Sequence, residues 1–193
     1  MANNIKSAYQ TAANLMQEFC NNQKNIETTK KIANLISETY KNGNKVLICG
    51  NGGSMCDAMH FAEEFTGRFR KDRKPLPAIA ISDPSHITCV GNDYGFDEIF
   101  SRGLEAFGKS GDVLIGISTS GNSANVIKAI NKAKELYIKT IGFLGKDGGK
   151  LNNNCDFELI APGKTTDRIQ EIHMAALHII IESVERELFP ENY

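Results

Sequence analysis

The sequence contains no tryptophan, no long apolar run and no excess of charge of one sign. No apolar stretch approaches the roughly 20 residues that span a bilayer, and the opening MANNIKSAYQ lacks the basic and apolar regions of a secretory signal. We therefore expect a soluble, cytoplasmic protein without membrane partners. Because 22 Lys and Arg residues balance 23 Asp and Glu residues, no overall field favours nucleic acid as a partner.

The few cysteines exclude two further kinds of protein. They are odd in number, widely spaced and form no CxxC pair, which argues against a disulfide framework and against a thiolate zinc site. They stand at Cys20, Cys49, Cys56, Cys89 and Cys155. We expect most of them to be small buried apolar side chains. Cys56 is the exception, because it follows a glycine-rich turn.

Apolar residues follow two different patterns along the chain. Up to residue 44, steps of three and four predict two amphipathic helices, separated by the polar stretch NNQKN at 21–25. From Lys45 onward, short apolar runs alternate with helical patterns, which is typical of a parallel sheet with crossover helices. The predicted strands lie at 45–50, 77–82, 112–118, 139–145 and 155–161.

The last predicted helix, at 167–188, is apolar over much of its circumference. Such a helix is either buried inside the fold or packed at a subunit interface. No repeat or linker divides the chain, so we expect a single domain over 1–193, with a helical segment at 1–44 and an α/β sandwich at 45–193. We further expect the two N-terminal helices and the last helix to form oligomer contacts.

The first predicted strand ends in the glycine-rich sequence Gly50-Asn51-Gly52-Gly53-Ser54. In a parallel sheet, ligands bind beyond the carboxyl ends of the strands, where such turns lie. Ser54 is a candidate N-cap, and Asp57 stands three residues later, at the spacing of a capping box. The glycines match neither GxGxxG nor GxxxxGK[ST], and no acidic residue ends the next strand, which disfavours a nucleotide site.

A second loop, at 118–123, follows the third predicted strand and reads Ser-Thr-Ser-Gly-Asn-Ser. Hydroxyl groups beside the free N–H groups of a helix N-terminus can hold a phosphate. Hydroxyl-rich loops are also often simple caps or turns. Because this loop lies at the same sheet edge as the glycine loop, we favour phosphate binding.

His60 and Glu64 stand four residues apart on the helix that follows the glycine loop, so they share one face. The pair can bind a divalent ion or act as acid and base, or it can be an exposed ion pair. We expect Glu63 to point elsewhere. Arg68, just beyond this helix, either assists a phosphate or complements the helix dipole.

Five segments together resemble the sugar isomerase (SIS) domain family and, within it, the phosphoheptose isomerases. They are CGNGGSMCDAMHFAEEFTGRF, AISDPSHITCVGNDYGF, GISTSGNSANVIKAI, GFLGKDGGK and DRIQEIHMAALHIII. The resemblance implies a doubly wound SIS-type domain with a five-stranded parallel sheet. It also implies a homotetramer with active sites at subunit interfaces. One Zn²⁺ per subunit would be held by His60, Glu64, Gln170 and His178.

The resemblance implies an aldose–ketose isomerase that converts sedoheptulose 7-phosphate to D-glycero-D-manno-heptose 7-phosphate. This is the first step of ADP- or GDP-heptose and lipopolysaccharide core synthesis. The carried-over substrate contacts are Asn51, Gly52, Gly53, Ser54, Glu64, Asn92, Asp93, Ser118, Thr119, Ser120, Ser123, Asp167 and Gln170. His86 and His173 match the family pattern without an assigned role.

The reaction moves a proton between two carbons through an enediol. Glu64 is the candidate base, and His178 is the candidate acid or base for the sugar oxygens. A carboxylate that also binds zinc is less basic, which leaves the role of Glu64 open. Gln170 and His178 are about 12 Å apart along one helix, so we expect subunits to share the site.

Two other functions remain as alternatives. The same family includes non-catalytic modules that bind sugar phosphates or associate with a replication initiator. It also includes isomerases for shorter sugars, which often carry an additional C-terminal regulatory pair. The joint presence of His60, Glu64 and His178 favours an enzyme over a binding module.

Overall fold

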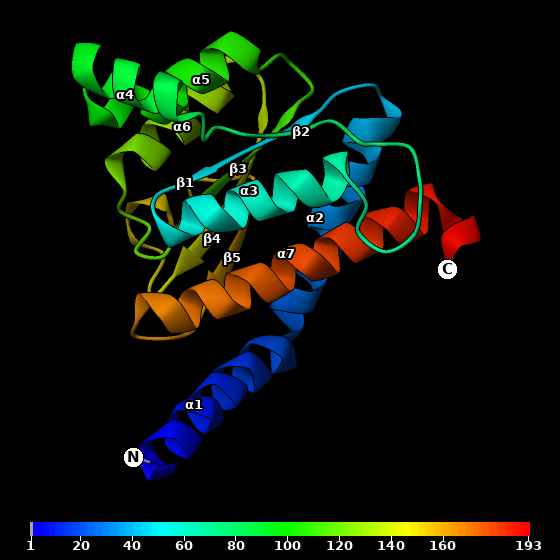
Figure 1. Ribbon diagram of the computed structural model, residues 1–193, viewed down its shortest axis with the longest axis vertical. Coiled ribbons are helices and arrows are strands. Elements are labelled where there is room, and N and C mark those ends of the chain that lie inside the picture. The colour runs from blue at the N-terminus through cyan, green and yellow to red at the C-terminus, as the bar shows by residue number, and fades with distance from the viewer. Residues whose placement is uncertain (1) are drawn as a thin grey trace.

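A computed structural model describes residues 2–193, and its centre is a parallel sheet covered by helices on both faces (Figure 1). The strand order is β2-β1-β3-β4-β5, and every neighbouring pair is parallel. The strands are β1 Val46–Gly50, β2 Ala78–Ala80, β3 Val113–Ser118, β4 Lys139–Gly145 and β5 Phe157–Ala161. The predicted α/β class and five-stranded parallel sheet are confirmed, although β2 is shorter than the predicted run.

The helices alternate with the strands after an all-helical start. The α-helices are α1 Ala2–Asn21, α2 Gln23–Lys41, α3 Gly53–Thr66, α4 Pro84–Asp93, α5 Ile99–Phe107, α6 Ala124–Glu135 and α7 Thr166–Leu188. Three short 3₁₀ helices are η1 Phe96–Glu98, η2 Gly149–Leu151 and η3 Pro190–Asn192. Across residues 2–193, no helix combines the length and the apolar character that a membrane span requires.

Two apolar cores lie on opposite faces of the sheet. On one face, α2, α3 and α7 bury side chains such as Ile36, Phe61 and Ile172 against the strands. On the other face, α5 and α6 bury Leu104, Ile130 and their neighbours. The strands β1 and β3 are buried at every position, as expected for a parallel sheet covered on both sides.

Helix α1 projects away from the sheet and packs only at its C-terminal end (Figure 1). Phe19 is its one buried residue, whereas Ile5 and Tyr9 are exposed. The polar break predicted at 21–25 is reduced to the single residue Asn22. Its side chain accepts a hydrogen bond from the Lys24 N–H at 3.1 Å and so caps α2, which lets the second helix begin at once.

Helix α7 runs across the molecule beside α3 and α2 (Figure 1). Its buried residues include Ile180, which is fully enclosed, while the adjacent Ile179 is 54% exposed. The helix is therefore largely packed inside the fold, one of the two arrangements that its apolar circumference allows, while Ile179 leaves part of it exposed. His173 is buried on the same helix, and its Nε2 donates to the Leu144 carbonyl at 2.7 Å.

The expectation that most cysteines are buried is wrong. Only Cys49, on β1, is fully buried, and Cys155 is half-buried. Cys20, Cys56 and Cys89 are exposed, because each stands on the outward side of a helix where the fold needs no apolar contact. All five are free thiols.

The buried His173 should make folding stability depend on pH. Burial lowers its pKa from 6.5 to about 4, so between these values the unfolded chain binds a proton that the folded protein does not. Stability contributed by neutral His173 is therefore lost as the pH falls below about 6.5, by about 3 kcal/mol at pH 4.

His173→Gln keeps a donor for the Leu144 carbonyl but cannot titrate. We expect the free-energy difference between wild type and this variant, measured by urea unfolding, to shrink by about that amount between pH 7.5 and pH 4. Because both proteins share the carboxylates that also titrate there, a constant difference would show that His173 does not contribute.

Candidate active site

A cavity of about 290 Å³ opens at the carboxyl ends of β1 and β3, between the two loops singled out from the sequence. These strands pair in register, with Gly50 opposite Ile117, so the loops that follow them start side by side. The cavity is lined by Asn51, Gly52, Gly53, Ser54, Ile117, Ser118, Thr119, Ser123, Thr166 and Gln170. Seven predicted substrate contacts thus meet with Gln170 in one place.

The glycine loop turns into α3 through backbone conformations that favour glycine. Gly52 is the N-cap, with φ +57°. The prediction that Ser54 caps the helix is wrong, since α3 already begins at Gly53. Ser54 is instead buried in the first turn, where its Oγ accepts a hydrogen bond from Gln170 Nε2 at 3.3 Å. A Cβ at Gly53 would lie 2.7 Å from the same Nε2, so glycine admits Gln170 here.

The serine loop presents its hydroxyls at the start of α6. The Ser118 and Ser123 Oγ atoms lie 3.0 Å apart. Ser123 is the N-cap residue, yet its hydroxyl makes no capping hydrogen bond, which leaves the N-terminal end of α6 open to an anion. Gly121, with φ +64°, packs so tightly on the Gly148 carbonyl that no side chain fits, and this contact holds the loop in place.

A pair of asparagines joins the two loops. Asn51 and Asn125 exchange two side-chain hydrogen bonds, at 2.8 and 2.9 Å, and Asn125 is buried on α6. Asn125 Oδ1 also accepts from the Val126 N–H at 2.9 Å. The amide of Asn51 is therefore occupied by a structural contact, although the residue lines the cavity.

Further along α3, three side chains converge. One ligand atom from each of His60, Glu64 and His178 lies within 4.8 Å of the others. His60 Nε2 is 3.2 Å from Glu64 Oε1, and the His60 and His178 rings meet edge to face with centroids 5.0 Å apart. The shared helix face predicted for His60 and Glu64 is confirmed, and α7 contributes the third group.

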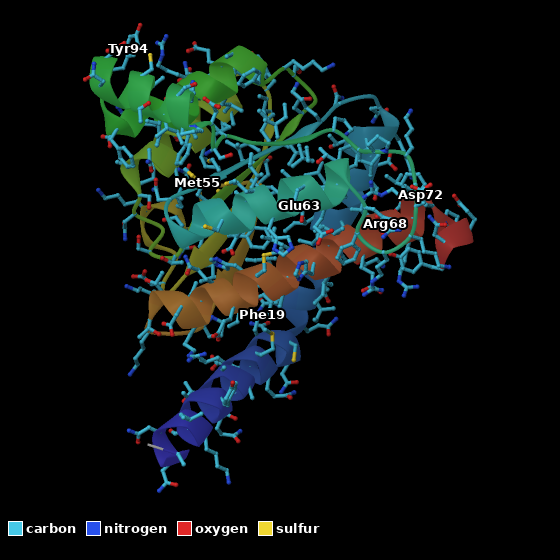
Figure 2. The ribbon with its side chains drawn as sticks, in the orientation of Figure 1. Phe19, Met55, Glu63, Arg68, Asp72 and Tyr94 are labelled. Atoms are coloured by element: carbon cyan, nitrogen blue, oxygen red, sulfur yellow. The ribbon has the colours of Figure 1, made fainter. Side chains whose placement is uncertain are left out.

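The two adjacent glutamates differ in position. The Glu64 side chain is only 16% exposed, whereas that of Glu63, labelled on α3 in Figure 2, is 64% exposed. Glu63 Oε1 lies farther from His60 Nε2, at 3.8 Å. Glu64, not Glu63, therefore belongs to the converging group, as the helical spacing predicts.

Burial sets the charge of the neighbouring groups. Desolvation lowers the pKa of His178, assisted by the nearby His60 and opposed by Glu64, so the imidazole of His178 is neutral at pH 7. Asp57 stands one turn before His60, and desolvation raises the pKa of its carboxyl. Its Oδ2 is buried without a hydrogen-bond partner among residues 2–193, so no capping box forms with Ser54.

The remaining predicted residues lie apart from the cavity lining. Asn92 and Asp93 stand exposed at the end of α4, where the amide of Asn92 donates to Asp93 at 2.7 Å. Ser120 accepts from the Asn122 N–H at 3.2 Å. Asp167 is an exposed residue beside Arg168 in the first turn of α7.

Gln170 and His178 do not meet. Gln170 lies against the first turn of α3, while His178 lies next to His60, two turns farther along the same pair of helices. Their separation follows the rise of α7, as predicted. One subunit thus brings together three of the four proposed metal ligands, and Gln170 belongs to the cavity.

Sequence reasoning missed three residues of this region: Asn125, Thr166 and Asp57. Asn125 and Thr166 are single polar residues at the starts of helices, a signal too common to single out. Asp57 was interpreted as a cap, yet it is three residues before His60 and therefore shares its helix face.

The comparisons with known proteins agree with this geometry. Residues 8–145 match the family model described as the SIS domain. A phosphoheptose isomerase of Fusobacterium nucleatum is 63% identical over 190 residues, which cover 98% of this chain and 98% of the relative. The chain belongs to the phosphoheptose isomerases of the SIS domain family.

Two further members of the family confirm the assignment. A phosphoheptose isomerase of Escherichia coli is 55% identical over 185 residues, covering 95% of this chain and 96% of that protein. The solved structure of a phosphoheptose isomerase from Neisseria gonorrhoeae superposes with a TM-score of 0.89 at 40% identity, covering 95% of this chain and 98% of that chain. The SIS fold expected from the sequence is therefore confirmed.

The serine loop gives a direct binding test. Ser118→Ala or Ser123→Ala removes one hydroxyl from the cavity, and a lost hydrogen bond to an anion costs about 1.5–3 kcal/mol. We expect each variant to bind inorganic phosphate at least about tenfold more weakly by calorimetry. Ser183→Ala is the control, because that hydroxyl bonds within α7 to the Ile179 carbonyl. Equal affinity of all variants would place the phosphate elsewhere.

Proposed function

We propose that this phosphoheptose isomerase converts sedoheptulose 7-phosphate to D-glycero-D-manno-heptose 7-phosphate with the residues described above. One observation carries the proposal. Helix α3 begins at the cavity between the glycine and serine loops, and it also presents His60 and Glu64 beside His178. His60 is seven residues beyond Gly53, a rise of about 10 Å. An extended sugar phosphate can therefore reach from the serine loop to the converging side chains.

The phosphate end is held by neutral groups. The hydroxyl-bearing residues Ser118, Thr119 and Ser123 line the cavity, which lies at the N-terminal ends of α3 and α6. Their fixed dipoles attract a dianion without a buried cation. This leaves the sugar chain to extend along α3 toward Glu64.

The donor set fits a metal ion. Two imidazoles and a carboxylate converge from α3 and α7, nitrogen and oxygen ligands that suit zinc, and the neutral His178 is in the protonation state that ligation requires. We propose Zn²⁺, held by His60, Glu64 and His178 of one subunit, with the Gln170 of a neighbouring copy as a further ligand, because Gln170 of the same subunit lies against the first turn of α3. Such an ion supplies Lewis acidity that polarises the sugar carbonyl.

Glu64 is the proposed base. Its half-enclosed carboxylate can remove the proton from one carbon and return it to the next, provided that substrate binding frees one of its oxygens. When its lone-pair nitrogen is free of the metal, neutral His178 can accept a proton from a sugar hydroxyl and give it back to the neighbouring oxygen. Asp57, one turn away, is a candidate partner for the sugar hydroxyls or for His60.

The binding-module alternative is less favoured. A protein that only binds sugar phosphates needs the cavity but not a converging His, Glu and His group beyond it.

We also propose that the product enters ADP- or GDP-heptose and lipopolysaccharide core synthesis, and that the enzyme is cytoplasmic. The single-domain division into 1–44 and 45–193 likewise stays a prediction.

We further propose a homotetramer with shared active sites. Asn92, Asp93 and Asp167 lie apart from the cavity lining in one subunit, so they reach substrate if a neighbouring copy brings them there. The exposed apolar residues Ile5 and Ile179 offer faces of α1 and α7 for such contacts.

Glu64→Gln tests the chemistry. We expect purified wild type to convert sedoheptulose 7-phosphate, followed by NMR, and a chelator to abolish turnover. Because the amide cannot accept a carbon-bound proton, kcat should fall at least about 100-fold while phosphate affinity is kept. Glu63→Gln is the matched control, since this neighbour points outward. A near-normal rate for Glu64→Gln would remove it as the base.

Ile179→Glu tests the assembly. Ile180 is unsuitable because it is fully buried, so a charge there would unfold the subunit. A charge at the exposed Ile179 leaves the core intact, and we expect it to reduce the mass measured by light scattering and to lower activity with it. A fully active monomer would contradict shared sites.

A further inference from the structure

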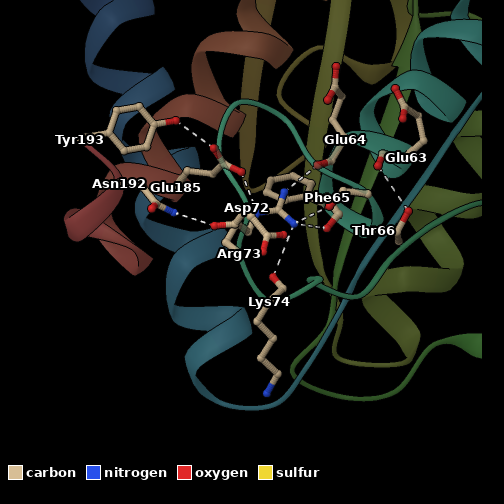
Figure 3. Close-up of polar contacts among 11 residues, drawn as sticks. Glu63, Glu64, Phe65, Thr66, Asp72, Arg73, Lys74, Glu185, Asn192 and Tyr193 are labelled. Atoms are coloured by element: carbon tan, nitrogen blue, oxygen red, sulfur yellow. Dashed lines mark hydrogen bonds and ion pairs between the residues drawn. The ribbon is translucent and has the colours of Figure 1, made fainter.

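A buried arginine closes the far end of α3. The Arg73 side chain is 1% exposed and lies on the long loop between α3 and β2, where it points back into the molecule (Figure 3). It donates to the carbonyls of Glu64 at 2.6 Å, Phe65 at 2.7 Å and Gly67 at 3.0 Å. These are carbonyls at the end of a helix, which have no partner within the helix itself.

The same guanidinium also binds α7. Arg73 Nε donates to Glu185 Oε1 at 2.7 Å, and the Glu185 side chain is 3% exposed. The second carboxylate oxygen accepts from the Tyr193 hydroxyl at 2.8 Å (Figure 3). Every oxygen of Glu185 is therefore occupied. A buried ion pair without such additional bonds would cost more in desolvation than it returns.

The position of this pair relates it to the active site. Glu64, whose carbonyl Arg73 holds, is the proposed base on α3. Glu185 stands seven residues, two helical turns, after His178 on α7. One planar group thus fixes the end of α3 against α7 close to the place where Glu64 and His178 must converge. The hydrogen bonds of Arg73 go to Glu185 and to backbone carbonyls, not to the side chain of Glu64 or His178.

We propose that Arg73 is a positioning residue that sets the separation of α3 and α7, and through it the distance between Glu64 and the two histidines. The proposal rests on the function proposed above. A planar fork with five donors can serve three carbonyls and a carboxylate together, whereas a lysine has only one nitrogen from which to donate. The requirement is therefore for arginine and not merely for a positive charge.

Arg73→Lys is the principal variant. We expect its affinity for Zn²⁺, measured alone by competition with a chromophoric chelator, to fall about 10- to 100-fold, as for other groups that orient metal ligands. We expect kcat for sedoheptulose 7-phosphate to fall by a similar factor. KM and the affinity for inorganic phosphate should stay within about twofold, because the serine loop lies at the other end of α3.

Arg70→Lys is the matched control. Arg70 is on the same loop and pairs with Glu182 on α7 at 2.7 Å, but its side chain is 47% exposed and it binds no α3 carbonyl. This variant should keep wild-type Zn²⁺ affinity and kcat. Tyr193→Phe removes one bond to Glu185 without disturbing the ion pair, so it should give a folded protein with a smaller change in the same direction.

A double variant separates positioning from stability. Replacing both members of a buried ion pair by apolar residues often restores stability, so Arg73→Met with Glu185→Met should recover thermal stability relative to Arg73→Met alone. If Zn²⁺ affinity and kcat stay low in this stable protein, Arg73 positions the site. If they recover together with stability, or if Arg73→Lys matches Arg70→Lys, the proposal is wrong.

The Zn²⁺ measurement also distinguishes this inference from the proposed function. Loss of metal affinity in Arg73→Lys would support positioning even if wild type did not isomerise the heptose. An active wild type with an unaffected Arg73→Lys would leave the function intact and overturn the inference.

Discussion

The in-register pairing of β1 with β3 sets the position of both loops that line the cavity. Gly50 stands opposite Ile117, so the two strands end at the same level of the sheet. Each then turns into a helix, and the N-terminal ends of α3 and α6 face one cavity. The hydrogen bonds between Asn51 and Asn125 fix the two turns to each other. The lining of this cavity carries no cationic side chain, so the phosphate site that we propose there would rest on neutral hydroxyl groups and helix polarity.

The second half of the site depends on helix packing and not on the sheet. Helix α3 carries His60 and Glu64 away from the cavity, and α7, packed beside it, adds His178. The distance between these helices decides whether the three side chains converge. Apolar contacts hold the middle of both helices, and the buried Arg73 holds the end nearest to Glu64 (Figure 3). The anchor and the reactive groups are thus positioned by separate parts of the fold.

Within residues 2–193, the buried side-chain polar atoms without a hydrogen-bond partner are Ser37 Oγ, the Tyr40 hydroxyl oxygen, Asp57 Oδ2 and His173 Nδ1. His173 is paired with the Leu144 carbonyl through Nε2, and burial of the ring lowers its pKa to about 4, which links its burial to acid sensitivity. Asp57 Oδ2 has no partner among residues 2–193 and lies one turn from His60. An orphaned carboxylate oxygen costs free energy unless a ligand uses it, so its position beside the reactive group is consistent with a role in binding.

The class of the fold and the shared face of His60 and Glu64 were predictable from the sequence, and the structure confirms both. Short apolar runs that alternate with helical patterns predicted the parallel sheet. The i, i+4 spacing predicted that His60 and Glu64 share a helix face. Both predictions rest on local patterns that follow from backbone geometry. Three features are visible only in the folded chain. Ser54 bonds to Gln170 and does not cap α3, and Arg73 joins two helices. Ile180 is enclosed, while its neighbour Ile179 is exposed. Those contacts join residues far apart in the chain, and the position of one helix against another is fixed by packing that no local pattern contains.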